Sequence, residues 1–259
     1  MNAKKLFVIA CYYDGSNNSI FECVNSIQKY YKSPHIAVID SNSPDKSYFE
    51  KLKEKGVIVY NVKNRNYDTG AYWYAYNKFK KVNYFYFLQD SVIFKKNLSK
   101  YEKNDLTTFR YFLSLNKVGG RKFEKTRKSI QNRIHDLFVS KKGYKNHDIY
   151  GFDFEKQIKW CKIKLNKTGY FMPKVWLSVF GPIFMCKKTV MKKLYKKRFH
   201  KILPTNKLEQ MCMERLFGIA FQQEGYDASN SIQGEHFTTP FETLNFQKKF
   251  FKRKYFMVS

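Results

Sequence analysis

The feature that most constrains the fold is a nearly unbroken apolar run, YFYFLQDSVIF, from position 84 to 94. A polar triplet, Gln89-Asp90-Ser91, interrupts it near its end. Such a run predicts a strand buried on both faces, as in the middle of a parallel sheet. A carboxylate at the end of that strand is costly to bury without a partner. Asp90 is therefore either a cap for the next turn or part of a binding site at the carboxyl end of the strand.

Shorter apolar runs alternate with helical patterns before this strand. The patterns predict strands at 6–13, 35–39 and 57–62, and helices at 19–31, 46–55 and 71–79. Because parallel neighbours need crossover connections, this alternation predicts an α/β fold with a doubly wound, mostly parallel central sheet flanked by helices. Further along, an apolar run at 175–186 is broken by Gly181-Pro182, and 206–224 has the apolar face of a helix.

An aspartate follows each of the predicted strands of the first half. These residues are Asp14, Asp40, Asp68 and Asp90. Because the carboxyl ends of parallel strands meet at one edge of the sheet, we expect a shared metal-and-phosphate site there. The chain has no Gly-x-Gly-x-x-Gly after the first strand and no P-loop motif, which argues against a dinucleotide-binding domain and a P-loop enzyme.

The chain is strongly basic, with 49 Lys and Arg against 21 Asp and Glu and a formal charge of +28. Such a field attracts nucleic acid, anionic membranes or nucleotide-linked substrates, although compositional bias in an AT-rich genome is an alternative explanation. The 5 cysteines show no paired spacing, which predicts buried free thiols in a reducing compartment. With no apolar run of membrane-spanning length, and with a first strand in place of a signal peptide, we expect a cytoplasmic protein.

The first ninety residues resemble a GT-A glycosyltransferase of the nucleotide-sugar-dependent kind, close to family 2. The resemblance lies in four segments: VIACYYD, VIDSNSPD, NRNYDTGAYWYAYN and YFLQDSV. The last segment stands where these enzymes carry Asp-x-Asp, and it is similar to the Asn-Asp-Ser variant of rhamnan-synthesis-type members. Here Gln89 and Ser91 flank a single carboxylate. This departure leaves open both a metal-dependent enzyme and an inactive relative.

The resemblance implies roles for particular residues. A divalent cation, Mn²⁺ or Mg²⁺, would be bound by Asp90 and His236. Glu214 would be the general base, with Glu209 as the alternative; a third interpretation of Glu214 is an ion pair within its own helix. Five residues separate the two glutamates, which places them on different helix faces. Donor binding would fall to Tyr12, Asp40, Asn66, Asp68, Gly70 and Gln89.

The resemblance implies one catalytic domain over residues 1–259. Residues 1–94 would bind the nucleotide sugar and 95–240 the acceptor, with a basic helix expected at 125–139. The basic, aromatic tail, 241–259, would lie on an anionic membrane or dock as a helix on the core.

The expected activity is transfer of one sugar, hexosyl or pentosyl, from a nucleotide-diphosphate sugar to a glycan or lipid-linked acceptor in polysaccharide biosynthesis. Inversion of the anomeric centre is implied by the resemblance. The alternatives are a nucleic-acid-binding protein, which the charge favours and the absence of a reader motif opposes, and a nucleotidyltransferase.

Overall fold

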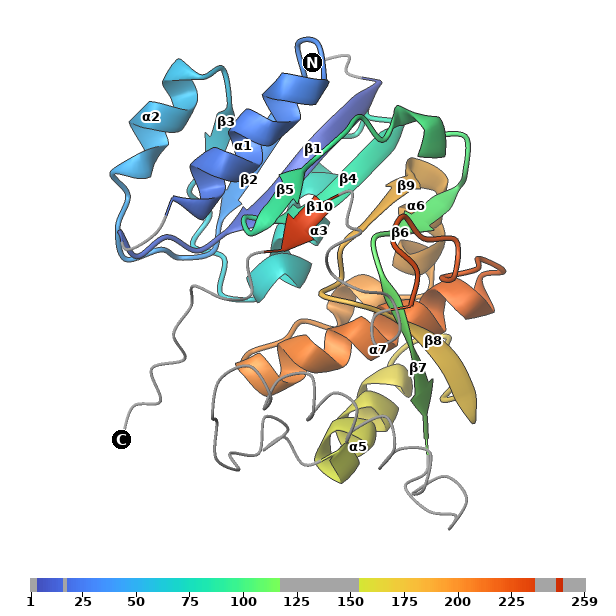
Figure 1. Cartoon of the computed structure of the whole chain (residues 1–259). Helices are drawn as coiled ribbons and strands as arrows, with labels where there is room; N and C mark the ends of the chain where they lie inside the picture. The colour runs from blue at the N-terminus through green and yellow to red at the C-terminus, as the bar shows by residue number, and fades with distance from the viewer. Residues whose placement is uncertain (1–3, 16–17, 117–153, 236–245, 249–259) are drawn as a thin grey trace, which may run out of the picture.

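The computed structural model describes residues 4–15, 18–116, 154–235 and 246–248. Its centre is a six-stranded sheet with the strand order β3-β2-β1-β4-β9-β6 (Figure 1). The first four strands in that order are parallel to one another, whereas β9 is antiparallel to both of its neighbours. The sheet is therefore mostly parallel, as the sequence predicts. Its strands are β1 (Lys5–Cys11), β2 (Ile36–Asp40), β3 (Ile58–Tyr60), β4 (Tyr84–Gln89), β6 (Leu106–Thr108) and β9 (Phe184–Lys187).

Helices cover both faces of the sheet, so the expected double winding is confirmed. On one face α1 (Ser19–Tyr30) and α2 (Tyr48–Glu54) pack against the alternate side chains of β1 that include Phe7 and Ile9. On the opposite face α3 (Tyr67–Lys78) packs against the set that includes Leu6 and Val8. Helix α7 (Lys207–Gln223) joins the same core, where Phe217 and Phe221 contact the ring of Phe184 in β9. Because successive strand side chains point to opposite faces, one continuous apolar strand supplies both cores.

The second half adds smaller elements around this sheet. An antiparallel ribbon of β7 (Tyr111–Leu115) and β8 (Val175–Val179) packs on α7. At the contact, a side chain at Gly218 of α7 would collide with the backbone of Leu177 in β8, so the close approach requires glycine. Further helices of the described residues are α5 (Phe154–Leu165), α6 (Lys188–Lys196) and two short 3₁₀ helices, η1 (Ser99–Tyr101) and η2 (Phe199–Lys201).

Three predicted elements need correction. Helix α3 begins at Tyr67, earlier than expected, because the Asn64 side chain donates to the Tyr67 carbonyl oxygen (2.6 Å) and accepts from the Asn66 amide (3.0 Å). The run after Asp90 leaves the central sheet as β5 (Val92–Phe94). The run at 175–186 divides at Gly181-Pro182 between two sheets, since β8 pairs with β7 and β9 pairs with β4.

Three residues of the basic tail form a strand, β10 (Phe246–Lys248), which pairs antiparallel with β5. The alternative of a docked helix is therefore wrong for these three residues. The rest of the tail, the predicted helix at 125–139 and His236 lie outside the described residues.

The cysteines are all buried free thiols, as predicted: Cys11, Cys23, Cys161, Cys186 and Cys212. Among the described residues, no helix is both long enough and apolar enough to span a bilayer.

Candidate functional site

The chain changes direction across the sheet between β1 and β4. It leaves β1 toward β2 and β3, and α3 then returns it to β4 on the other side of β1. In open α/β sheets ligands bind outside the carboxyl ends of the strands at such a switch point. Tyr12 follows β1 and Asp90 follows β4, and the Tyr12 amide donates to Asp90 Oδ2 at 3.4 Å. The two residues therefore mark the candidate site.

Asp90 is 6% exposed and lies beside two buried thiols. Burial, followed by the charge of Asp90, raises the pKa of the Cys11 thiol and that of the Cys23 thiol. Both thiols therefore stay protonated and neutral near the carboxylate. Tyr12 beside it is 47% exposed, which leaves an aromatic ring at the mouth of the site.

Asp68 joins the strand end to two helices. It lies in the first turn of α3, where the helix dipole favours a negative charge. Its carboxylate accepts hydrogen bonds from the Gln89 amide at the end of β4 and from the Gln210 amide on α7. The Thr69 backbone amide donates a third, at 3.0 Å. The carboxylate is 5% exposed and acts as a buried hub for amide donors.

Gly181 connects the same strand end to Glu214. Gln89 Nε2 donates to the Gly181 carbonyl oxygen at 2.8 Å, and the Gly181 amide donates to Glu214 Oε1 at 3.0 Å. Gly181 has a φ of 63°, in the left-handed region that glycine adopts most readily. The structure therefore places Glu214 within two hydrogen bonds of Gln89, the residue that precedes Asp90.

Gln210 was not singled out by sequence reasoning, although a signal for it exists. It precedes Glu214 by four residues on α7, and residues at that spacing share a helix face. Besides its bond to Asp68, its Oε1 accepts from Thr69 Oγ1 at 3.4 Å. One face of α7 thus supplies two polar side chains to the site.

Glu209 serves another purpose at the start of α7. Its carboxylate accepts from Trp160 Nε1 (2.8 Å), from the Thr205 amide (2.7 Å) and from Thr205 Oγ1 (2.8 Å). Burial raises its pKa, but the hydrogen bonds from Thr205 and Trp160 and the charge of Lys164 together outweigh burial and lower the pKa overall. Its own amide donates to Oδ1 of the N-cap residue Asn206. The Glu209 carboxylate therefore ties the start of α7 to Trp160 and Thr205, whereas Glu214 accepts from the Gly181 amide.

Tyr72 is a second residue that sequence reasoning did not single out, and its hydroxyl group is the relevant part. It is buried and has no hydrogen-bond partner among the described residues. Burial, then the charges of Asp68 and Asp90, raise the pKa of Tyr72, so the hydroxyl stays a neutral donor. An unpaired buried hydroxyl costs about 1–3 kcal/mol, which a ligand oxygen or a water molecule in hydrogen-bonding reach would recover.

The other expected donor-binding residues organise loops at the same edge. Asp40 is fully buried and accepts from Lys46, from the Tyr48 hydroxyl (2.7 Å) and from the Ser43 amide (3.3 Å). Asn66 Nδ2 donates to the Pro204 carbonyl oxygen at 3.0 Å. At Gly70 an added side chain would collide with Oδ1 of Asn64, so glycine is required there by close packing.

The expectation that four carboxylates share one metal site is wrong for the described residues. No group of three or more His, Cys, Asp or Glu side chains among them is placed to hold a metal ion. Asp40 and Asp90 end strands on opposite sides of β1, two spacings of about 4.8 Å apart, and the donors around Asp40 satisfy it locally. Asp14 lies exposed in the turn after β1.

The segment before His236 runs beside β6 and β7. The Ile232 amide donates to the Thr108 carbonyl oxygen at 3.0 Å, and Tyr111 bridges to Glu235. Next to it, the buried Arg110 donates from Nε to Gln233 Oε1 at 3.0 Å. Burial lowers the pKa of Arg110 and the charge of Glu235 opposes that shift, so the guanidinium stays cationic.

No protein-family model matches the chain, and no curated protein matches it either. Several solved structures do. S. aureus TarS 1–349 shares 13% identity over 82% of this chain and 55% of its own, with a TM-score of 0.41. The same protein in complex with UDP shares 12% identity over 81% and 54%, with a TM-score of 0.39.

A third structure is core-mannan synthase A (CmsA/Ktr4) from Aspergillus fumigatus in its Mn/GDP form. It shares 8% identity over 85% of this chain and 66% of its own, with a TM-score of 0.41. The chain thus spans between about half and two thirds of the length of these three structures. At this level of identity and overlap, the likeness does not assign the chain to a family.

Proposed function

We propose that this chain is a glycosyltransferase of GT-A type that transfers one sugar from a nucleotide-diphosphate sugar to a glycan or lipid-linked acceptor. The observation that carries the proposal is the link from Gln89 through Gly181 to Glu214. It places a carboxylate of the second half beside the strand end that carries Asp90, at the switch point of the sheet. Sugar transfer needs these two functions together: a site for the diphosphate and a base for the acceptor hydroxyl.

The donor would bind at the ends of β1, β2 and β4. The exposed ring of Tyr12 is available to stack on a base, while Asp40 holds the loop after β2 in place. The start of α3, with Asn66, Asp68 and Gly70, would contribute the opposite wall, where helix N-terminal amides suit an anion.

A divalent cation would be held by Asp90, with His236 as a further ligand. Mg²⁺ and similar ions in such enzymes use one or two carboxylates together with substrate phosphates and water. The single carboxylate Asp90 fits that pattern. When bound, the cation would neutralise charge on the diphosphate leaving group.

Glu214 would accept the proton of the acceptor hydroxyl. The Gly181 amide fixes the orientation of its carboxylate, and Gln210 one turn earlier connects the same helix face to Asp68. Attack on the side of the sugar opposite the leaving group inverts the anomeric centre, an outcome that we propose from the family resemblance.

The test is a panel of UDP, GDP, CDP and dTDP sugars, each with and without Mn²⁺, read by thermal shift and by product formation. A ligand that binds only the folded state raises the unfolding temperature. We expect a metal-dependent shift for one nucleotide that is lost in Asp90→Asn and kept in Asp105→Asn, a matched change at an exposed carboxylate.

Two outcomes would contradict parts of the proposal. A metal-independent shift would keep sugar transfer and remove the cation from Asp90 and His236. The absence of any shift, together with tight, salt-sensitive binding of nucleic acid, would replace the proposal with a nucleic-acid-binding function. Release of pyrophosphate in place of a nucleoside diphosphate would indicate a nucleotidyltransferase.

A further inference from the structure

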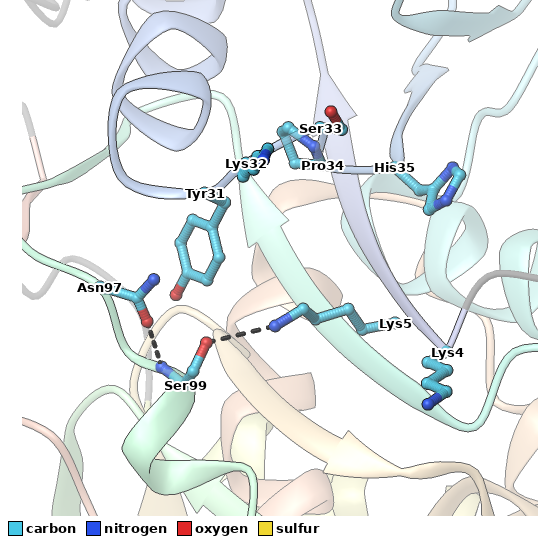
Figure 2. Close-up of a pocket in the computed structure, with 9 residues that line it drawn as sticks. All are labelled: Lys4, Lys5, Tyr31, Lys32, Ser33, Pro34, His35, Asn97 and Ser99. Atoms are coloured by element: carbon cyan, nitrogen blue, oxygen red, sulfur yellow. Dashed lines mark hydrogen bonds between the residues drawn. The ribbon is translucent and has the colours of Figure 1, made fainter.

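A pocket of about 400 Å³ lies at the amino edge of the central sheet, opposite the candidate site. Its walls come from the start of β1, from the connection between α1 and β2, and from the segment after β5 (Figure 2). Pockets of about 300–1,000 Å³ are the size that holds small organic ligands. Nothing in the proposed sugar transfer uses this pocket.

The charge of the lining is one-sided. Lys4, Lys5, Lys32 and His35 all line the pocket, and none of its nine lining residues is acidic. Lys4, Lys32 and His35 are exposed, so their cationic or donor groups are accessible to a solute. A concave surface with charges of one sign concentrates ligands of the opposite sign.

Lys5 reaches across the pocket in a fixed conformation. Its Nζ donates to Ser99 Oγ at 3.2 Å and to Glu102 Oε1 at 2.8 Å, and it lies 5.3 Å from the centre of the Tyr31 ring (Figure 2). Glu102 balances the charge of Lys5 from outside the lining. Lys4 and Lys32 therefore carry the surplus positive charge of the pocket.

The walls are fixed by hydrogen bonds between segments distant in sequence. The Leu98 amide donates to the Tyr31 hydroxyl at 2.7 Å, and Asn97 Nδ2 donates to the Tyr30 carbonyl oxygen at 2.8 Å. The Phe7 amide donates to the His35 carbonyl oxygen at 2.9 Å. A pocket with its walls already joined in this way needs little ordering to bind a ligand.

We propose that this pocket binds a small phosphate-bearing organic molecule, attracted by the surplus positive charge that Lys4 and Lys32 give to its lining. Lysine ammonium groups bind phosphate as point charges, and His35 adds a further donor to the same lining. The rest of the pocket volume of about 400 Å³ accommodates the organic part. The site is independent of the sugar-transfer proposal because it lies at the other end of the strands.

The test is isothermal titration of the full chain with glucose 6-phosphate, and with glucose as a neutral control, at constant ionic strength. We expect saturable binding of one glucose 6-phosphate per chain and none of glucose. The double variant Lys4→Gln/Lys32→Gln should weaken binding by about tenfold or more, because the surplus positive charge of the lining is lost. The variant Lys162→Gln/Lys192→Gln removes two exposed lysines elsewhere and should leave binding unchanged.

Equal weakening in both double variants would overturn the proposal, because it would show that the overall positive field and not the pocket attracts the phosphate. Non-saturable binding would overturn it as well. The Asp90→Asn variant should bind glucose 6-phosphate normally; a loss there would place the phosphate at the carboxyl edge instead. Measurement of this variant therefore distinguishes an error in the pocket proposal from an error in the proposed glycosyltransferase site.

Discussion

The two edges of the central sheet differ in charge and in the burial and hydrogen bonding of their charged side chains. At the carboxyl edge, Asp40 and Asp68 are buried and accept several hydrogen bonds each. At the amino edge, Lys4 and Lys32 are exposed around an open pocket. Changes at the carboxyl edge should therefore affect stability as well as ligand binding, whereas changes at the amino edge should affect ligand binding alone.

The largest effect is expected on catalysis at the carboxyl edge. Glu214→Gln keeps the size of the side chain and an oxygen for the Gly181 amide, but removes the base. General base catalysis contributes about 10²–10⁴-fold, so kcat should fall by about that factor, with a much smaller change in KM. Single-turnover measurements check this. The matched change Glu54→Gln, at an exposed position of α2, should leave kcat unchanged; an equal loss there would contradict the role of Glu214.

The next largest effect should be on stability at the same edge. Asp68→Ala leaves the amide groups of Gln89 and Gln210 without their shared acceptor in a buried site. We expect a loss of about 3 kcal/mol in the free energy of unfolding, since each unsatisfied buried group costs about 1–3 kcal/mol. Urea denaturation measures it, with the exposed Asp227→Ala as the control. A loss of unfolding free energy below that of the control would show that the Asp68 carboxylate does not hold Gln89 of β4 and Gln210 of α7 together.

A smaller, pH-dependent effect is expected at the start of α7. The folded pKa of Glu209 lies below its ordinary value of 4.5, because hydrogen bonds from Thr205 and Trp160 and the charge of Lys164 together outweigh burial. Its contribution is therefore present above pH 4.5 and is lost as the pH falls through the lower folded value. Glu209→Gln should cost at most about 1 kcal/mol at pH 7, because hydrogen bonds to a partly exposed charged group become neutral ones, and progressively less in acid. Urea denaturation at several pH values checks this, and a pH-independent cost would contradict it.

Removal of the Tyr72 hydroxyl, which has no partner among the described residues, should slightly stabilise the protein without ligand. Tyr72→Phe eliminates a buried donor that has no partner among the described residues, so the free energy of unfolding should rise by up to about 1 kcal/mol. If the hydroxyl meets a ligand, the same change should weaken binding of the nucleotide sugar. Thermal unfolding with and without ligand separates the two effects. A destabilised free protein would show that a water molecule already pairs with the hydroxyl.

The smallest stability effect is expected at the amino edge. Lys4→Gln/Lys32→Gln changes two exposed side chains, so the free energy of unfolding should stay within about 0.5 kcal/mol of the original. Urea denaturation of this variant beside Asp68→Ala tests the contrast between the edges directly. A loss above about 2 kcal/mol would show that the pocket lysines stabilise the fold, and the contrast would be wrong.

The sequence predicted local structure well where the pattern is local. The strands and helices of the first half follow the apolar periodicity, and α7 begins and ends within one residue of the predicted 206–224 range. The position of Asp90 at the end of a buried strand was also correct. These features depend on spacings of two to four residues, which a single sequence displays directly.

Tertiary structure alone decided which polar groups meet. Gln89 and Gly181 are 92 residues apart, and Asp68 and Gln210 are 142 residues apart. The division of the 175–186 run between two sheets, the bond from Trp160 to Glu209 and the pocket at the amino edge likewise depend on distant partners. The sequence by itself determined the elements and the strand end that carries Asp90. The meeting of that strand end with Glu214 was decided by packing of the second half, because hydrogen bonds between distant segments leave no periodic trace in the chain.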